Sequence, residues 1–173
     1  MNAKNSNVSE VREWVQSIVI AVVLAFAIKL FLFDFVIVKG SSMFPTLHDG
    51  ERLVINKIEY MIGSPDYGDI VVLKYDEKTE YVKRVIAKGG DTIEIENMEV
   101  YVNDQLLNET YINIEPYGDM EKVLIPEGHY FVMGDNRANS ADSRMNDLGF
   151  VPENNIHGRV FFRFWPFEKF GGV

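Results

Sequence analysis

The N-terminal part of the chain contains one long and almost uninterrupted apolar run. Residues 14–33 read WVQSIVIAVVLAFAIKLFLF and carry a single formal charge, at Lys29. A helix of this length is about 30 Å long, which matches the hydrocarbon core of a bilayer. Trp14 and Lys29 lie near its two ends, where an aromatic ring and a long cationic side chain suit the lipid headgroups. We therefore expect a transmembrane helix over residues 14–33, preceded by a short N-terminal tail over residues 1–13.

Two other interpretations of this run stay open. A buried core helix is also apolar on every face, although few small soluble domains need one. A cleaved secretory signal is the second, because Ala25-Phe26-Ala27 resembles a cleavage site, but the run stays apolar beyond that point and begins after a weakly basic segment. Basic residues flank the run on both sides, so their distribution does not predict which end lies inside the cell.

Beyond residue 34 the pattern changes to short apolar runs separated by Gly, Asp and Asn. The runs are rich in Val, Ile, Tyr and Phe, which is typical of β-strands. The expected strands cover residues 35–39, 52–57, 69–75, 80–87, 92–95, 99–102, 129–134 and 158–164. We therefore expect a mostly β protein, in which the N-terminal helix is followed by a compact all-β domain over residues 34–173, an open barrel or a sandwich.

Two segments of this β-domain have a more specific pattern. The alternation in residues 92–102 predicts a β-hairpin with its turn at Glu96-Asn97. Residues 108–128 are weakly patterned and contain Pro116 and Pro126, which predicts a long excursion over the surface.

Composition and charge narrow the classes of function. The chain has 173 residues, of which 47% are hydrophobic, enough for one domain with its own core and a short appendage. The 26 acidic residues outnumber the 17 basic ones, giving a net charge of -9, whereas nucleic-acid binding requires a basic face. Cysteine is absent, which excludes disulfides, a Cys nucleophile and Cys-based metal sites. The three histidines show no metal-ligand spacing, so we expect no metal and no cofactor.

Three polar segments are candidates for chemistry. Residues 40–47, GSSMFPTL, place adjacent serines on a constrained turn, as an exposed nucleophile requires. Residues 80–87, EYVKRVIA, place Lys83 among apolar neighbours, where burial would lower its pKa and allow the neutral amine to accept a serine proton. Residues 134–144, GDNRANSADSR, are dense in turn formers and charged groups, which predicts a rigid hydrogen-bonded network.

Each segment taken alone has a simpler explanation. The serines fit an ordinary turn, the lysine fits a sheet edge, and the third segment fits a solvated loop. A Ser-His-Asp triad also stays open at this point, because the members of such a triad meet only in the fold.

Taken together and in this order, the segments resemble the type I signal peptidases (leader peptidases), which are serine proteases with a Ser/Lys dyad. GSSMFPTL resembles the nucleophile box of this family, KRVIAKGGD its lysine box and GDNRANSADSR its third box. The resemblance runs from the apolar run to about Trp165. The single expected membrane span, the short domain and Gly40 resemble the Gram-positive subclass.

The resemblance implies that Ser42 is the nucleophile and that Lys83 is the general base. Ser140 is then expected to hydrogen-bond the Lys83 amine, and Asp142 and Arg144 are expected to form a supporting salt bridge.

The remaining site residues are also carried over from the family motifs. Asp135 and Arg137 are expected to brace the third segment, and the backbone N–H of Ser42 is expected to be one oxyanion donor. Gly40 stands where many Gram-negative members have a serine that supplies the second donor, and Ala138 stands where the family often has Asp. The second oxyanion donor is therefore not assigned. By motif position, the residues expected to bind substrate are Val36, Val38, Met43, Leu47, Tyr81 and Val82.

The implied function is that of a membrane-anchored serine endopeptidase that removes signal peptides from exported preproteins. It is expected to cut after a small-x-small motif such as Ala-x-Ala, because an extended substrate sends alternate side chains into the protein together. The implied location is the cytoplasmic membrane, with one span, the N-terminus inside and the catalytic domain outside. Expected partners are signal peptides, the lipid bilayer and, by proximity, the secretion translocon, but no nucleic acid.

Three alternatives are kept. A plasmid-transfer-type or other Ser/Lys peptidase of the same superfamily would differ in substrate rather than in chemistry. A self-cleaving repressor-type protease would carry a DNA-binding module where this chain has its apolar run. A non-catalytic membrane-tethered β-module would tolerate the loss of Ser42 and Lys83.

Overall fold

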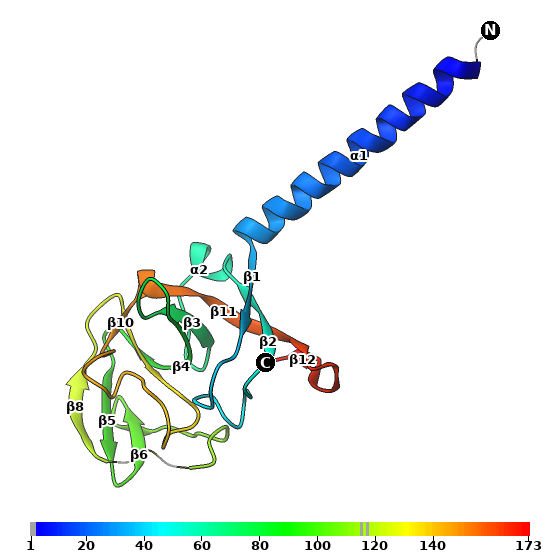
Figure 1. Cartoon of the computed structure of the whole chain (residues 1–173). Helices are drawn as coiled ribbons and strands as arrows, with labels where there is room; N and C mark the ends of the chain where they lie inside the picture. Colours follow the sequence, from blue (N-terminus) through cyan, green and yellow to red (C-terminus); the bar gives the residue numbers. More distant parts are fainter. Residues whose placement is uncertain (1–2, 115, 117) are drawn as a thin grey trace.

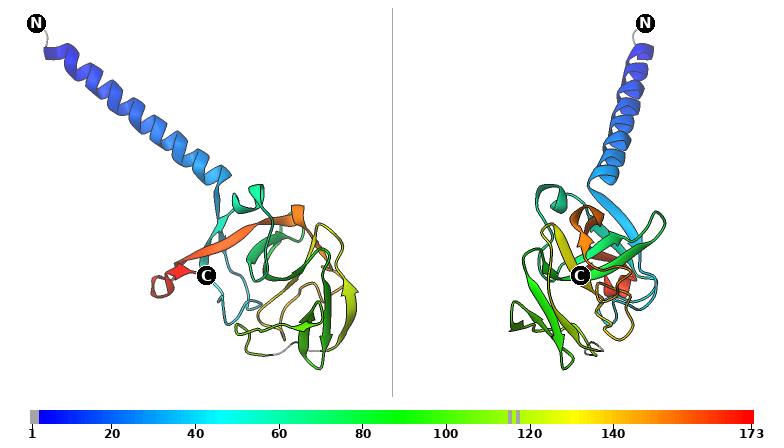
Figure 2. Two further views of the ribbon diagram at one scale, coloured as in Figure 1. Left: turned by 180° about the vertical axis from the view of Figure 1, so that it is seen from behind. Right: turned by 90° about the vertical axis from the view of Figure 1, so that its left-hand side faces the viewer.

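The long apolar run forms a helix that stands apart from the rest of the protein. The structure is a computed structural model that describes residues 3–114, 116 and 118–173, without the side chains of residues 3–9 and 27–31. Helix α1 (Ala3–Phe31) extends away from the β-strands and leads into strand β1 (Phe33–Ile37) (Figures 1 and 2).

The apolar side chains of α1 between Val11 and Phe26 are exposed. Within the part of the chain that the structure describes, no helix is both long enough and apolar enough to span a membrane. The membrane-spanning role expected of residues 14–33 therefore stays a prediction, and the side chain of Lys29 lies outside those described.

The rest of the chain forms two antiparallel sheets, which confirms the prediction of a mostly β protein. The larger sheet has the strand order β1-β2-β11-β3-β4-β9-β10, with β12 paired to β11, and the smaller sheet has the order β7-β6-β5-β8. The further strands of the larger sheet are β2 (Arg52–Asn56), β3 (Ile70–Lys74), β4 (Glu80–Lys88), β9 (His129–Met133), β10 (Val151–Pro152), β11 (Ile156–Trp165) and β12 (Gly171–Gly172). The smaller sheet consists of β5 (Thr92–Glu96), β6 (Glu99–Val102), β7 (Gln105–Leu106) and β8 (Met120–Leu124). Three short helical turns complete the fold, namely α2 (Glu59–Ile62), η1 (Glu153–Asn155) and η2 (Phe167–Lys169).

All the apolar runs expected as strands form strands, with boundaries moved by at most two residues. Two details of the prediction were wrong. The β5–β6 turn lies at Asn97 and Met98, one residue later than expected, because Glu96 still pairs with Glu99 and both turn residues have positive φ. Residues 108–128 are not only a surface excursion, since they contain β8, which pairs with β5 through its backbone.

The hydrophobic core fixes the two sheets against each other and supports the segment that follows β1. One cluster joins Ile86 and Phe131 of the larger sheet to Ile93 of the smaller sheet. Another contains Met43 and Leu47, which are almost completely buried. Burial of two such side chains stabilises the fold by about 1.5–3 kcal/mol each. The segment between them is therefore held firmly on the larger sheet.

Candidate active site

Ser42 lies on a turn that both its sequence and its neighbours hold in place. Gly40 has φ +83°, a backbone conformation that favours glycine, and its N–H donates to Asp49 Oδ1 at 2.7 Å. Directly after the serine, the side chain of Met43 is buried in the core. The half-buried Ser42 side chain is thereby held at the edge of a groove.

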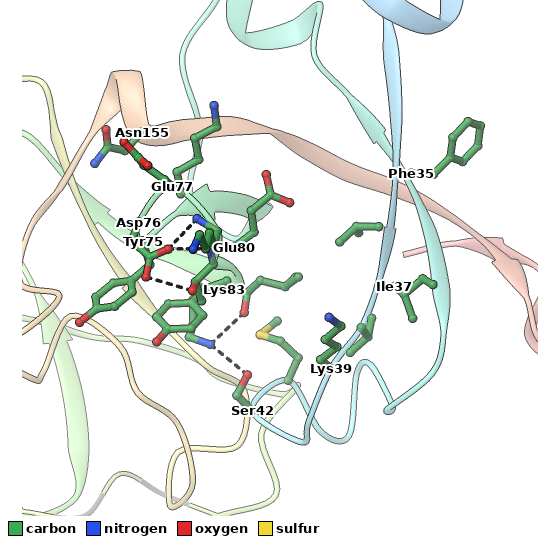
Figure 3. Close-up of a pocket in the computed structure, with 18 residues that line it drawn as sticks. Phe35, Ile37, Lys39, Ser42, Tyr75, Asp76, Glu77, Glu80, Lys83 and Asn155 are labelled. Atoms are coloured by element: carbon green, nitrogen blue, oxygen red, sulfur yellow. Dashed lines mark hydrogen bonds between the residues drawn. The ribbon is translucent and has the colours of Figure 1, made fainter.

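Lys83 points from strand β4 toward this serine (Figure 3). Its side chain is nearly completely buried, and its Nζ donates to Ser42 Oγ at 2.9 Å and to the Val82 carbonyl at 3.1 Å. Burial lowers the pKa of the Lys83 amine to about 8, while the negative charges of Asp142 and Asp135 oppose this shift. A substantial fraction of the amine is therefore neutral in mildly alkaline solution, and a neutral amine can accept the serine proton.

The third polar segment, residues 134–144, forms a loop organised around a buried carboxylate. Asp142 accepts hydrogen bonds from Arg144 Nε and Nη2, both at 2.8 Å, and from the Gly134 N–H at 3.0 Å. Burial alone would raise the pKa of Asp142, but the Arg144 guanidinium and the Gly134 N–H hold it below its ordinary value. Asp142 is therefore an anion that the loop encloses.

The hydrogen bond expected between Ser140 and Lys83 is not formed. The Ser140 hydroxyl is buried, and in the described part of the chain it has no hydrogen-bond partner. It packs against Gly134 instead, and the amine of Lys83 uses the Val82 carbonyl as its second acceptor.

Asp135 and Arg137 each link the loop to a different part of the protein and do not pair with each other. Asp135 is fully buried and accepts from Arg84 Nε at 2.9 Å, Arg84 Nη2 at 2.7 Å and Thr46 Oγ1 at 2.5 Å. It thus connects the loop to the lysine strand and to the serine segment. Arg137, also buried, donates to both carboxylate oxygens of Glu109 and to the Gly134 carbonyl.

Two asparagines bind the loop to the backbone of the serine segment. The Asn136 N–H donates to the Ser42 carbonyl at 3.0 Å, and its side-chain amide donates to the Ser41 carbonyl at 3.1 Å. Asn139 Nδ2 donates to Ser41 Oγ at 3.1 Å. The Ser42 N–H donates no hydrogen bond among the described residues and is available to a ligand, whereas the Gly40 N–H is already used by Asp49.

Sequence reasoning missed several of these residues. Arg84, Asn136 and Asn139 stand inside the segments singled out above, but no role was predicted for them. Glu109 had no signal of its own, because it lies in the weakly patterned segment. Only the general rule that a buried arginine requires a carboxylate pointed to such a partner.

A groove of about 820 Å³ runs along the dyad (Figure 3). Its walls come from β1, the turn between β3 and β4, and β4, and none of the three histidines lines it. Of the residues expected to bind substrate, those that line the groove are Val36, Val38, Met43, Tyr81 and Val82.

The expectation for Leu47 was wrong. This side chain is fully buried in the cluster with Leu53 and Ile55, so it supports the floor of the site instead of lining it.

The comparisons of the sequence with known proteins agree on one family. The sequence model described as "Signal peptidase, peptidase S26" matches residues 11–165. Signal peptidase I of Bacillus amyloliquefaciens is 48% identical over 167 residues, which is 90% of this chain and 86% of that protein. Signal peptidase IB of Staphylococcus aureus (strain COL) is 38% identical over 93% of each chain. The crystal structure of a signal peptidase I from Enterococcus faecalis V583 is 30% identical, with a TM-score of 0.49, over 55% of this chain and 95% of that one.

Proposed function

The chain belongs to the signal peptidase family, peptidase S26, and is a peptidase, and from this premise we propose that it cuts with Ser42 as nucleophile and Lys83 as general base. The observation that carries the proposal is the 2.9 Å contact between Lys83 Nζ and Ser42 Oγ at the wall of a groove. This distance lies within the reach that proton transfer requires.

The proposed reaction follows from the position of these groups. The neutral Lys83 amine takes the proton of Ser42, and Oγ attacks the scissile carbonyl to form a tetrahedral intermediate. The free Ser42 N–H donates to the negatively charged oxygen that develops there. The Lys83 ammonium then protonates the leaving amine, and a water molecule releases the acyl group from Ser42 with Lys83 again acting as the base.

The proposed substrates are signal peptides of exported preproteins, cut after a small-x-small motif. Support comes from the names of the relatives and from the shape of the site. Strand β1 is the last strand of its sheet, so an extended peptide can lie beside it with alternate side chains directed toward Val36 and Val38. Val36, Val38 and Met43 give this part of the groove an apolar lining, which suits small apolar side chains of the substrate.

The proposal also includes attachment to the bilayer through α1, with the N-terminus inside and the catalytic domain outside. The exposed side chains from Val11 to Phe26 are mostly apolar, and a helix that is apolar all round requires an apolar environment. Such an anchor would hold the groove at the membrane surface, near the translocon, and would raise the effective concentration of membrane-inserted substrates.

The test is the cleavage of a preprotein with an Ala-x-Ala site by the full-length protein in lipid vesicles. We expect the protein to sediment with the vesicles, and sequencing of the product N-terminus to show one cut after the last Ala. Cleavage at other sites only would favour the plasmid-transfer type of substrate. Failure to cut any preprotein would contradict a signal peptidase activity and favour a tethered binding module.

Activity is expected to rise with pH as Lys83 loses its proton. Since the buried amine has a pKa of about 8 and only the neutral form accepts the serine proton, kcat/KM should increase through this pH and level off above it. The measurement is the pH profile of kcat/KM for a peptide that lacks ionisable side chains. A profile that is flat from pH 6 to 10, a range set by the ordinary pKa values of His and Lys, would contradict this role.

A further inference from the structure

The connection between strands β7 and β8 reaches across to the loop over residues 134–144. Its residue Glu109 accepts from Arg137 Nη1 at 2.8 Å and from Arg137 Nη2 at 2.5 Å. Its residue Tyr111 donates from its hydroxyl to Glu109 Oε1 at 2.9 Å. The ring of Tyr111 lies 4.0 Å from the guanidinium carbon of Arg84 and 5.9 Å from that of Arg137. This connection therefore contacts both Arg84, which follows Lys83 on β4, and Arg137 of the loop over residues 134–144.

Arg137 is connected to the nucleophile through the backbone of Gly134. Arg137 Nε donates to the Gly134 carbonyl at 3.0 Å. Gly134 packs so closely on the serine segment that an added Cβ would lie 2.4 Å from the Ser42 carbonyl oxygen. A shift of Arg137 would therefore be transmitted to Ser42 through the close contact between Gly134 and the Ser42 carbonyl.

Arg84 is connected to the general base, Lys83, because the two residues are neighbours on one strand. Arg84 follows Lys83 on strand β4 and holds Asp135 with two hydrogen bonds. Asp135 in turn accepts from Thr46 of the serine segment. The Tyr111 ring covers the Arg84 guanidinium at a distance that favours a cation–π contact.

We propose that Glu109 and Tyr111 are positioning residues, which hold Ser42 and Lys83 at their reactive distance through Arg137 and Arg84. This inference rests on the proposed function of the dyad and deepens it.

Charge and burial explain why Glu109 matters for geometry as well as for stability. The side chain of Arg137 is completely buried and that of Glu109 is 7% exposed, so the guanidinium has its counterion within the protein. A buried charge that loses its partner is strongly destabilised and moves toward water or another acceptor. Because Arg137 is also bonded to the Gly134 carbonyl, that movement would displace the loop from Ser42.

The experiment compares two substitutions that each remove one buried carboxylate. Glu109→Gln keeps the shape of the side chain but leaves Arg137 without its counterion. Asp91→Asn is the matched control, because Asp91 is also buried and also accepts from a tyrosine hydroxyl, that of Tyr67, but its hydrogen bonds are to Tyr67, Lys88 and Asn103 and not to residues 134–144. For each full-length variant in vesicles, kcat and KM are measured on the Ala-x-Ala preprotein and normalised to the burst of acyl-enzyme.

For Glu109→Gln we expect kcat to fall about tenfold with KM nearly unchanged, because the lost contacts orient the reacting groups. Asp91→Asn should lower the midpoint of thermal unfolding by a similar amount and leave the normalised kcat unchanged. Equal kcat values for the two variants would overturn the inference. If Glu109→Gln does not fold, Tyr111→Leu provides the same test of kcat against the Asp91→Asn control. This substitution removes the aromatic ring that covers Arg84 without removing a charged group.

A second measurement separates this inference from the proposed function, because it requires no activity. NMR titration of labelled lysine reports the pKa of Lys83, whose charged neighbours are Asp142, Asp135 and Arg144. Glu109→Gln should shift this pKa toward the ordinary value of lysine, because a displaced loop lets water reach the amine, and Asp91→Asn should not. An unchanged Lys83 pKa in Glu109→Gln would overturn the inference even if the wild-type protein cleaved nothing.

Discussion

Replacing Lys83 with methionine is expected to lower kcat/KM for preprotein cleavage by about 10³-fold or more, because it removes the amine that we propose as the general base for Ser42. Methionine keeps most of the buried side-chain volume, so the loss would come from the amine and not from a cavity. Ser42→Ala should cause a loss of the same size. The double variant should be no less active than either single variant, because the two residues act as one unit.

The matched control for this prediction is Lys88→Ala. Lys88 lies on the same strand, β4, but is partly exposed and forms a salt bridge with Asp66 at 3.0 Å. Surface pairs of this kind contribute little to stability, so its kcat/KM should stay within about twofold of the wild type. Steady-state kinetics of the wild type and the four variants check the prediction. Activity that survives in Lys83→Met would assign the proton transfer to another group, and no histidine lines the groove.

Gly134→Ala is expected to have the second largest effect, although it adds only a methyl group. The new Cβ would lie 2.2 Å from Ser140 Oγ and 2.4 Å from the Ser42 carbonyl oxygen, distances that no real contact allows. The backbone of the nucleophile or the loop would have to move. A displacement of about 1 Å at the reacting groups can cost about 10²-fold in rate, and we expect a loss of this order in kcat/KM. The unfolding midpoint should fall as well, since overpacking a close contact costs about 1–3 kcal/mol.

Gly172→Ala provides the comparison for this substitution. There the added Cβ would meet only the Phe161 carbonyl oxygen, at the ordinary distance of 3.8 Å. Kinetics and thermal unfolding of both variants are the measurements. A Gly134→Ala protein with wild-type kcat/KM and midpoint would contradict the close packing of the loop on the serine segment.

The local pattern of the sequence determined the elements of this protein. Strands such as Glu80–Lys88 and His129–Met133 were predicted nearly to the residue, because period-two alternation and turn residues are properties of neighbouring positions. A helix over the apolar run was also predicted, but its bounds differ, because α1 covers Ala3–Phe31 and not residues 14–33. The three polar segments were visible for the same reason, and their order allowed the family to be recognised before any contact was known.

Only the tertiary structure decided the contacts between segments that are far apart in the chain. Ser42 and Lys83 are 41 positions apart, and contacts between distant segments, among them the pairing of β3 with β4 and the burial of Met43, bring the amine to the hydroxyl and withdraw it from water. The burial of Leu47 and the lack of a hydrogen bond at Ser140 depend on side-chain packing in the same way.

Glu109 is the clearest case of this division. Its segment has no hydrophobic period, and its partner Arg137 is 28 positions away. An ion pair of this kind forms because a buried guanidinium requires a counterion. The packing of the two sheets decides which segment of the chain lies close enough to supply the carboxylate. The sequence by itself indicated the candidate residues for the chemistry, and the packing of the two sheets determined which residues meet. Local periodicity follows from neighbours along the chain, whereas burial and charge pairing depend on distances that exist only after folding.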